Sequence, residues 1–334
     1  MYAPGDVRVE ERDDPAIVEP TDAILKLAAT CVCGSDLWPY RGVEDVDHAP
    51  MGHEYVGTVV AVGDDVREVK VGDFVVGSFF ASDNNCAICR AGYQSRCVHA
   101  QPMGGIGTQA EFARVPLADG TLVATPGPPS EDLIPSLLAA SDVLGTGWFG
   151  AVAADVGPGK TVAVVGDGAV GLCAVLAAEQ LGADRIIAMS RHADRQALAR
   201  EFGATDIVEE RGDAGVAKIK ELTDGLGAHS VIEAVGTQES MMQAIRSTRP
   251  GGHVGYVGVS HGVELPGQEL FFSGVHLHGG PAPVRRFLPE LIELIWNRTI
   301  NPGKVFDLTL PLAQADEAYQ AMDQRRATKV LLTL

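Results

Sequence analysis

The sequence has little of what would direct a protein to nucleic acid or to a membrane surface. Among its 334 residues, 26 are lysine or arginine and 44 are aspartate or glutamate, which gives a formal net charge of -18. Because this excess of negative charge repels phosphate-rich polymers and anionic lipids, we expect neither nucleic acid nor a membrane as a partner. The N-terminal stretch has no basic segment followed by an apolar one, so nothing there predicts secretion, and we expect a cytoplasmic location.

Long hydrophobic runs are also scarce. Residues 161–178 are almost continuous in apolar and small side chains, which resembles the composition of a membrane span. Asp167 and the glycines around it interrupt this run. The run is therefore better explained as a buried strand, a turn and a buried helix.

Cysteine is limited to six residues, three of which lie close together at Cys86, Cys89 and Cys97. In a cytosolic chain such clustering favours a metal site over disulfides. We interpret Cys31 and Cys173 as small core residues.

Glycine is abundant, with 39 residues, in a composition that is 46% hydrophobic and 21% charged. This is typical of a folded α/β protein with many tight turns. The length suggests about two domains. Up to about residue 125, short β-rich runs at 23–27, 55–62 and 74–77 predict a compact β-dominated domain, and a proline-rich turn then precedes a helix-like stretch at 133–144.

The pattern changes after about residue 145, where apolar runs alternate between strand-like and helix-like periods. The predicted strands are 161–165, 185–190, 231–235, 253–259 and 275–278, and the predicted helices between them are 169–181 and 195–202. This alternation indicates a doubly wound parallel sheet. Two further helices at 286–296 and 314–325 and a closing strand at 329–333 complete the prediction.

A glycine loop joins the first strand of this region to its helix. It reads Gly166, Asp167, Gly168, Ala169, Val170, Gly171. A bare GxGxxG pattern is weak evidence, but between a buried strand and a helix its glycines permit a tight turn and leave the helix N-terminus open to a pyrophosphate. We therefore predict dinucleotide binding, with an ordinary strand-to-helix turn as the alternative.

The end of the next strand bears on the choice of dinucleotide. An NAD-selective fold usually has an acidic residue about 20 positions after the loop, but this sequence reads Met189, Ser190, Arg191, with Arg195 close behind. The two arginines and the serine hydroxyl are suited to a 2'-phosphate, so we favour NADP over NAD. The alternative is that both arginines begin a solvated helix.

Several motifs together resemble the zinc-dependent medium-chain dehydrogenase family, which includes the zinc-containing alcohol dehydrogenases. They are the string from Thr30 to Trp38, the triplet Gly52-His53-Glu54, the cysteine loop, the glycine loop and the segment Ala327 to Val330. The resemblance extends over nearly the whole chain. It implies a β-rich GroES-like catalytic domain at 1–143 and 287–334 and a Rossmann cofactor domain at 144–286.

The resemblance implies a catalytic zinc held by Cys33, His53 and Asp142, with Glu54 behind the metal or as an alternate ligand. Three protein ligands leave one position open, as a catalytic zinc requires. The implied reaction is hydride transfer between an alcohol, which we expect to be secondary or apolar, and NAD(P). In the family the hydroxyl matching Ser35 takes the alcohol proton and passes it toward a histidine, but that position is Trp38 here. The last step of the proton path is therefore open.

A second, structural zinc is implied by the spacing of Asp83, Cys86, Cys89 and Cys97, where family members carry four cysteines. Aspartate can still ligate zinc through oxygen. The alternative is an empty loop of three free thiols.

Other positions are implied by the same resemblance. Contacts to the nicotinamide or the pyrophosphate are expected from Thr146, Val257, Gly258, Val259 and Lys329. Pocket-lining aromatic residues are expected at Trp38, Phe79 and Trp148, which suits a largely apolar substrate. We also expect a homodimer or homotetramer formed through the strand at 275–278.

Two other functions are compatible with parts of this pattern. One is a zinc-independent reductase of quinones or activated alkenes with the same fold. The other is a dinucleotide-binding protein without catalysis. The three expected zinc ligands argue against both.

Overall fold

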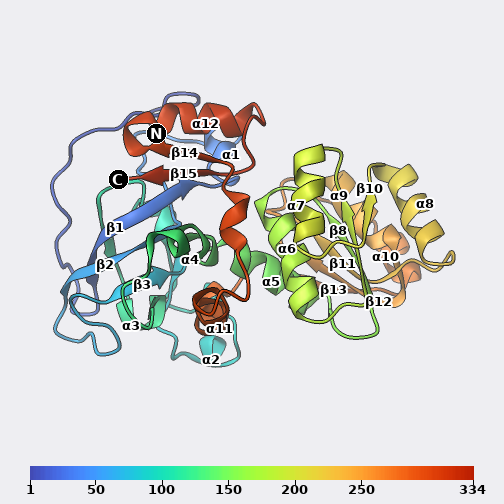
Figure 1. The fold of residues 1–334 in the computed structure, drawn as a ribbon, viewed down its shortest axis with the longest axis horizontal. Coiled ribbons are helices and arrows are strands. Elements are labelled where there is room, and N and C mark those ends of the chain that lie inside the picture. The colour runs from blue at the N-terminus through green and yellow to red at the C-terminus, as the bar shows by residue number, and fades with distance from the viewer. The chain divides into compact units, whose positions relative to one another are not determined.

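The structure is a computed structural model that describes all 334 residues. The chain divides into two compact units, the first comprising residues 1–142 and 283–334 and the second residues 143–282 (Figure 1). The sequence analysis placed these boundaries after residues 143 and 286.

The first unit is built on a seven-stranded sheet. Its strands follow the order β14-β15-β1-β2-β3-β7, with β6 also paired to β1. Their bounds are β1 Ala23–Val32, β2 Tyr55–Val62, β3 Phe74–Gly77, β6 Phe112–Val115, β7 Leu122–Ala124, β14 Leu308–Pro311 and β15 Val330–Thr333. Apolar side chains of β1, β2 and β3, among them Leu25, Tyr55 and Val75, form the core of this unit and are completely buried. Burial of these large apolar surfaces stabilises the sheet.

The pairing of β1 with β2 positions the candidate site. The two strands are antiparallel, and Thr30 near the end of β1 lies opposite Tyr55 at the start of β2. Cys33 follows the end of β1, and His53 and Glu54 precede the start of β2. Antiparallel pairing therefore brings these three residues to the same edge of the sheet, although they are distant in sequence.

The predicted helix at 133–144 is wrong in one respect that matters for the site. The structure has a 3-10 turn at Glu131–Leu133 and then α4 at Ile134–Ala140, and α5 begins anew at Val143. The Ser141 hydroxyl donates to the Leu138 carbonyl at 2.7 Å and so satisfies a terminal backbone group of α4. The helix ends there, which leaves Asp142 between the two helices.

The second unit is a six-stranded parallel sheet in the order β10-β9-β8-β11-β12-β13. Its strands are β8 Thr161–Val165, β9 Arg185–Met189, β10 Asp206–Val208, β11 Ala228–Glu233, β12 Thr248–Tyr256 and β13 His276–Gly279. This order, in which the direction of winding reverses between β8 and β11, is that of the dinucleotide-binding doubly wound fold. The predicted fold class is confirmed.

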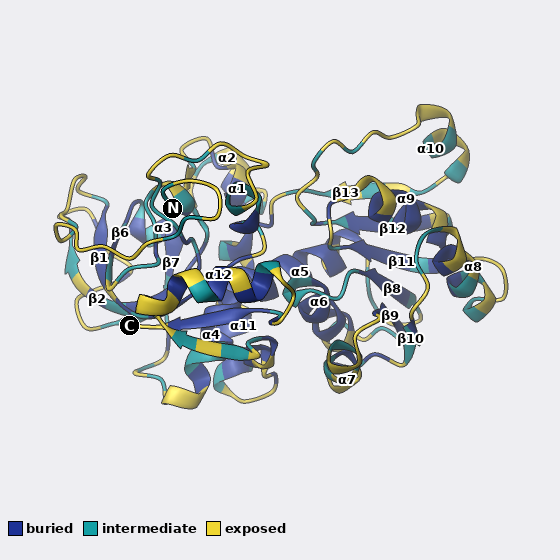
Figure 2. Cartoon of the chain, turned by 90° about the horizontal axis from the view of Figure 1, so that it is seen from above, coloured by how far each residue is buried: buried dark blue, intermediate teal, exposed yellow.

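The helices of this unit are α5 Val143–Ala153, α6 Ala169–Gln180, α7 Ala193–Glu201, α8 Gly212–Leu222, α9 Gln238–Ser247 and α10 Gly267–Ser273. Figure 2 shows the central strands as buried, whereas α8 and α10 carry much exposed surface. The sequence analysis missed β10, α8, α9, α10 and nearly all of α5. It also placed β11 and β12 several residues too late, because it followed apolar residues that continue into the loops at the carboxyl ends of these strands.

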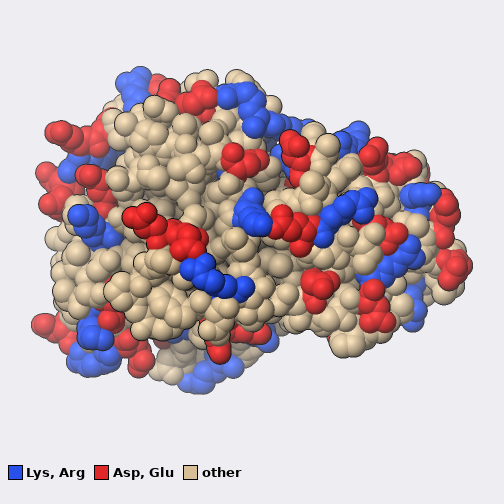
Figure 3. Space-filling view, viewed as in Figure 1, with Lys and Arg blue, Asp and Glu red and all other residues tan.

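The C-terminal part of the first unit contains α11 Val284–Trp296 and α12 Ala315–Asp323. The short elements of this unit are α1 Leu37–Tyr40, β4 Phe80–Ala81, α2 Ala87–Arg90, β5 Gln101–Pro102, α3 Ala118–Thr121 and 3-10 turns at 94–96, 103–105, 302–305 and 312–314. No single helix is both long and apolar enough to cross a membrane, and the pair α4 and α5 meets that description only jointly, by length and composition. On the face shown in Figure 3, acidic and basic side chains are interspersed.

Candidate metal centre and cofactor loop

Four side chains converge at the edge formed by β1 and β2. One potential ligand atom from each of Cys33, His53, Glu54 and Asp142 lies within 4.8 Å of the others. Asp142 Oδ2 is 3.8 Å from Cys33 Sγ and 3.3 Å from His53 Nε2. Cys33, Glu54 and Asp142 are more than nine-tenths buried, and 13% of the His53 side chain is exposed. The structure therefore brings together the residues that the sequence analysis assigned to a catalytic zinc.

A second layer of polar groups orients these side chains. Asp36 Oδ2 accepts from the Cys33 backbone N–H at 2.9 Å, and Asp36 Oδ1 lies 3.5 Å from His53 Nδ1. Gln109 donates to the same Asp36 carboxylate at 3.3 Å, and Tyr319 donates to Gln109 at 3.0 Å. A carboxylate behind a ligating histidine fixes its ring and tautomer, so that Nε2 is left to face the other donors. Sequence reasoning missed Asp36 in this role.

Lys329 forms an ion pair with Glu54 of the metal cluster. Its ammonium is 1% exposed and lies 2.6 Å from Glu54 Oε1 and 3.3 Å from the Val32 carbonyl. These two partners hold the fully buried ammonium beside the metal cluster. Lys329 is thus the counter-ion of Glu54, and its expected contact with the cofactor pyrophosphate stays a prediction.

The electrostatics of the cluster favour an additional positive charge. Burial raises the pKa of the Cys33 thiol, and the nearby Glu54 carboxylate raises it further. Burial alone would lower the pKa of His53, but Cys33, Asp36 and Asp142 raise it well above its usual value. The raised pKa values of Cys33 and His53 have a common cause, which is that several anionic groups lie close together in a buried space.

A divalent zinc ion fits this donor set. A thiol, an imidazole and a carboxylate are the ligand types that zinc prefers, and a bound metal ion deprotonates a coordinating thiol whatever its pKa is without the metal. Glu54 Oε2 is buried and has no hydrogen-bond partner, so one carboxylate oxygen of the cluster is left for a metal ion to engage.

The second predicted cluster also comes together. Ligand atoms of Asp83, Cys86, Cys89 and Cys97 all lie within 4.8 Å of one another. Cys89 Sγ is 3.5 Å from Cys86 Sγ and 3.4 Å from Asp83 Oδ1. Burial would raise the pKa of Asp83, but backbone N–H groups of Asn85 and Cys86 and the imidazole of His99 lower it well below its usual value. Asp83 is thus ionised, and the loop presents a carboxylate and three sulfurs to one point.

The glycine loop has the shape needed for a pyrophosphate. Gly166 has φ +119°, and a Cβ on Gly171 would lie 2.0 Å from the Gly166 carbonyl oxygen, so both positions require glycine. Gly168 caps α6 in an extended conformation, and a Cβ built on it meets nothing within 4 Å. The space beside Gly168 at the start of α6 is therefore open, which is compatible with a phosphate bound at this helix terminus.

The adenosine end of the expected cofactor site contains a carboxylate that the sequence pattern did not reveal. Ser190 was predicted as the last residue of the strand, but it directly follows β9 and is buried. Its hydroxyl donates to Asp167 at 2.7 Å, and Arg195 Nη1 lies 3.3 Å from the same carboxylate. Arg191 is exposed. Ser190 and Arg195 are thus brought together as expected, but around Asp167.

The remaining expected contacts are distributed between the units. In the first unit, the Phe79 ring lies 6.2 Å from the His53 ring, and Trp38 is half-buried in α1. In the second unit, Thr146 and Trp148 are buried on α5. Val257, Gly258 and Val259 follow β12 at the carboxyl edge that also carries Gly166, rather than extending the strand. Their roles stay predictions.

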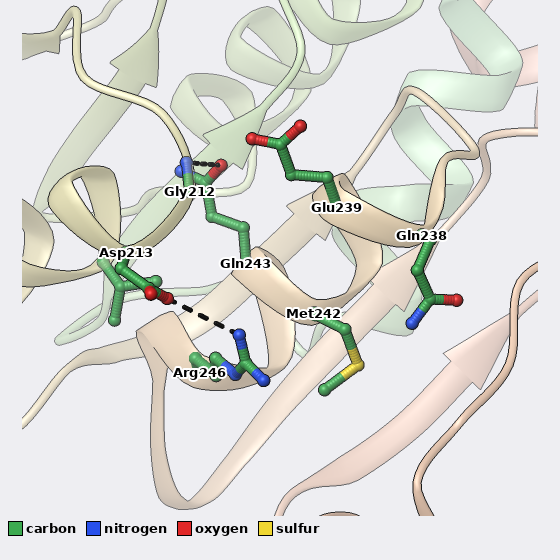
Figure 4. Close-up of a pocket in the computed structure, with 8 residues that line it drawn as sticks. Gly212, Asp213, Gln238, Glu239, Met242, Gln243 and Arg246 are labelled. Carbon is green, nitrogen blue, oxygen red and sulfur yellow. Dashed lines mark hydrogen bonds and ion pairs between the residues drawn. The ribbon is translucent and has the colours of Figure 1, made fainter.

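A pocket between α8 and α9 lies outside both metal clusters (Figure 4). It is lined in part by Gly212, Asp213, Gln238, Met242 and Arg246, and Arg246 lies 3.5 Å from Asp213 across it. The lining contains no thiol or imidazole. It is therefore not a candidate for the chemistry that the metal cluster supports.

Comparison with known proteins agrees with the two-unit architecture. Residues 19–127 match the alcohol dehydrogenase GroES-like domain, and residues 169–297 match the zinc-binding dehydrogenase family. The chain is 34% identical to zinc-type alcohol dehydrogenase B of Aspergillus flavus, over 99% of this chain and 79% of that protein. It is 33% identical to the NADP-dependent isopropanol dehydrogenase of Thermoanaerobacter brockii, over 91% of this chain and 89% of that protein.

Solved structures give the same result. The alcohol dehydrogenase of Thermus sp. ATN1 superimposes with a TM-score of 0.89 at 30% identity, covering 100% of this chain and 98% of that one. Similarity of this extent, in sequence and in fold, covers both units and the residues of the metal cluster. The chain therefore belongs to the zinc-containing medium-chain dehydrogenase family, as an oxidoreductase related to the alcohol dehydrogenases.

Proposed function

We propose that this protein is a zinc-dependent alcohol dehydrogenase that transfers a hydride between an alcohol and NADP and yields the aldehyde or ketone. The observation that carries the proposal is the convergence of Cys33, His53 and Asp142 at one buried point, with Asp36 oriented behind His53. A zinc ion held there would act as a Lewis acid toward the substrate oxygen, and the nicotinamide would exchange the hydride.

The chain's own residues have distinct tasks in this proposal. Cys33, His53 and Asp142 hold the metal and leave a position open for substrate. Asp36 keeps the His53 ring in place, and the Lys329 ammonium neutralises Glu54. Ser35 directly follows Gly34 after the ligand Cys33, and its half-buried hydroxyl is the group we assign to accept the alcohol proton.

We infer a secondary or apolar alcohol as the substrate class. The Phe79 ring lies 6.2 Å from the His53 ring, so one large aromatic side chain belongs to the surroundings of the metal cluster, and we assign half-buried Trp38 on α1 to the same pocket. Aromatic walls favour apolar substrates. The similarity to an NADP-dependent isopropanol dehydrogenase supports the same class and the same cofactor.

The test is turnover of a panel of primary, secondary and polyol substrates with both cofactors. We expect higher kcat/KM with NADPH than with NADH in the reduction direction, preference for secondary alcohols, and loss of activity after removal of metal by a chelator. Activity that survives complete metal removal, on quinones or activated alkenes instead of alcohols, would contradict the zinc-dependent mechanism. Cofactor binding without turnover of any alcohol would favour a non-catalytic role.

We also propose that the protein forms a homodimer or homotetramer through β13. This strand ends the sheet order, so its outer backbone edge has no partner strand within the chain. Phe271 and Phe272 on the preceding α10 are 78% and 75% exposed, which is unusual for adjacent aromatic side chains. Light scattering should give a dimer or tetramer, and Phe271→Glu together with Phe272→Glu should shift it toward the monomer. A monomeric wild-type protein would contradict this proposal.

A further inference from the structure

Asp167 occupies an unusual position in the second unit. It stands between the first two glycines of the loop after β8, and its carboxylate contacts residues that follow β9 and β10, the next two strands along the sheet. Ser190 after β9 donates to it at 2.7 Å, Arg195 lies 3.3 Å away, and Arg211 after β10 lies 3.9 Å away. Because β8, β9 and β10 are adjacent and parallel, their carboxyl ends meet at one edge, where these groups gather.

The cluster is enclosed, unlike most surface ion pairs. Ser190 is completely buried, and the side chains of Asp167 and Arg195 are 16% and 17% exposed. Hydrogen bonds to an enclosed carboxylate are stronger than those at an open surface. Asp167 therefore holds Ser190 and Arg195 firmly as long as no other anion is bound.

Arg211 indicates that the cluster can accept a further anion. Its Nη1 atom is buried without a hydrogen-bond partner, and its Nη2 atom lies 3.9 Å from the Asp167 carboxylate. Burial lowers the pKa of Arg211, and the neighbouring Arg191 lowers it as well, while Asp167 and Glu239 act in the opposite direction. A buried N–H donor without a partner is costly, so an additional anionic oxygen at this point would stabilise it.

We propose that Asp167 is a specificity-determining residue that competes with the ribose 2'-phosphate of NADP for Ser190 and Arg195, and that Arg211 is a further ligand of that phosphate. This inference rests on the proposed preference for NADP. One hydroxyl proton cannot serve both anions, and an ionised carboxylate beside a phosphate dianion repels it. Binding of the 2'-phosphate therefore requires Asp167 to release the two groups, and the strength of this competition limits the preference for NADP over NAD.

A different role for Asp167 makes the opposite prediction. An acidic residue in this region can accept hydrogen bonds from the ribose hydroxyls and so favour NAD. In that case the removal of its charge weakens binding of a cofactor without the 2'-phosphate. The two roles are separated by a pair of ligands that differ only in that phosphate, namely adenosine 2',5'-bisphosphate and 5'-AMP.

The experiment is calorimetric titration of the full-length protein and its Asp167→Asn variant with each ligand. We expect Asp167→Asn to bind adenosine 2',5'-bisphosphate about tenfold more tightly than the wild type, with 5'-AMP affected less than about twofold, because one charge-assisted hydrogen bond no longer has to be broken. The matched control is Asp224→Asn, which removes one exposed carboxylate from the turn before β11, at the amino edge of the same sheet. It should leave both affinities unchanged.

A second variant tests the other half of the proposal. Arg211→Gln should weaken adenosine 2',5'-bisphosphate about tenfold and leave 5'-AMP unaffected. If Asp167→Asn fails to fold, as judged by circular dichroism, Asp167→Ser removes the same charge with a smaller polar side chain and has the same expected result. Unchanged or weaker binding of the bisphosphate in the Asp167 variants overturns the proposal for Asp167, and an unchanged affinity in Arg211→Gln overturns the role of Arg211.

The wild-type measurement judges the proposed cofactor separately. If the wild-type protein binds 5'-AMP as tightly as the bisphosphate, the NADP preference is wrong. A selective gain for the bisphosphate in Asp167→Asn would still support the competition in that case. A selective loss of 5'-AMP would instead assign Asp167 to the ribose hydroxyls and overturn the inference.

Discussion

Lys329 and Glu54 form a completely enclosed ion pair, 2.6 Å from Nζ to Oε1, between residues 275 positions apart in the sequence. It joins the start of the last strand, β15, to the residue that precedes β2. Glu54 is also part of the metal cluster, and its second carboxylate oxygen has no partner. The pair thus connects the attachment of β15 to the sheet with the charge balance of the candidate metal cluster.

Removal of one partner of this pair should destabilise the protein strongly. We expect Lys329→Met to lower the free energy of unfolding by about 3–5 kcal/mol, because Glu54 is left buried without its counter-ion. The double variant Lys329→Met with Glu54→Gln should regain part of this loss, since the unpaired charge is then absent. Urea unfolding of the four proteins of this cycle measures the coupling. Additive effects of the two substitutions would show that the ion pair does not act as a unit.

Asp142→Asn tests the third metal ligand. The amide oxygen is a much weaker zinc ligand than a carboxylate, so we expect zinc content and turnover to fall together, with turnover reduced by about a hundredfold or more. The matched control, Asp316→Asn, removes an exposed carboxylate on α12 and should retain both. Metal analysis of the purified variants alongside kcat provides the measurement. Full activity with a normal zinc content in Asp142→Asn would refute the assignment.

Asp36→Asn tests the residue behind His53. The amide keeps an oxygen for the Cys33 backbone N–H but removes the negative charge beside His53 Nδ1. Zinc affinity, measured by competition with a chelator, should fall by about 10–100-fold. Asp47→Asn, whose carboxylate is 91% exposed, serves as the control. An unaltered affinity in Asp36→Asn would mean that the His53 ring is held by packing alone.

The extent to which the sequence predicted the site depends on how local each signal is. Cys33 and His53 lie in short motifs beside predicted strands, so their meeting follows once β1 and β2 pair. Asp36 lies in the same motif, but its task depends on Gln109 and Tyr319, which come from distant segments. The pairing of Lys329 with Glu54 depends on how β15 joins the sheet. No local pattern encodes such a contact.

The fold shows the same division. Predicted strands with continuous apolar runs, such as 161–165, agree with the structure residue for residue. The sequence analysis missed the amphipathic helix α9, although the sequence contains a signal for it. Thr237 and Ser240 form a capping box at its N-terminus. Helix α8 begins at Gly212 and contains Gly215, two poor helix formers, and it is stabilised by packing on α9. The local sequence disfavours a helix here, and tertiary contacts stabilise it.

The second cluster should bind a zinc ion of its own. Asp83, Cys86, Cys89 and Cys97 provide one carboxylate and three sulfurs, and backbone N–H groups of Cys89 and His99 point at the sulfurs of Cys86 and Cys97. We expect two zinc ions per subunit in the wild type and one in Cys97→Ser, with kcat per remaining zinc little changed and the Tm lowered by several degrees. Cys173→Ser, in α6 of the other unit, is the control for loss of a buried thiol. A single zinc in the wild type would show that this loop holds no metal.

His229 should make part of the stability depend on pH. Burial lowers the pKa of His229, and the neighbouring Arg249 lowers it further. Its Nδ1 accepts from the Thr161 backbone N–H at 3.0 Å, which also requires an unprotonated nitrogen. Because the folded-state pKa lies below the unfolded value of about 6.5, the unfolded chain takes up the proton first as the pH falls. The contribution of His229 is therefore complete above about pH 6.5 and is lost below it, until the folded-state pKa is reached.

His229→Gln removes this titration and keeps an acceptor for the Thr161 N–H. The wild type should lose more unfolding free energy than the variant between pH 7.5 and about 5, whereas the two curves should run parallel above about pH 7. Urea unfolding at closely spaced pH values gives both curves. His261→Gln, which replaces an imidazole in the loop after β12, should follow the wild type. The prediction is wrong if His229→Gln and the wild type lose stability in parallel as the pH falls below about 6.5. That result would mean that the His229 imidazole is protonated as easily in the folded protein as in the unfolded chain. The hydrogen bond from the Thr161 N–H would then not lower its pKa.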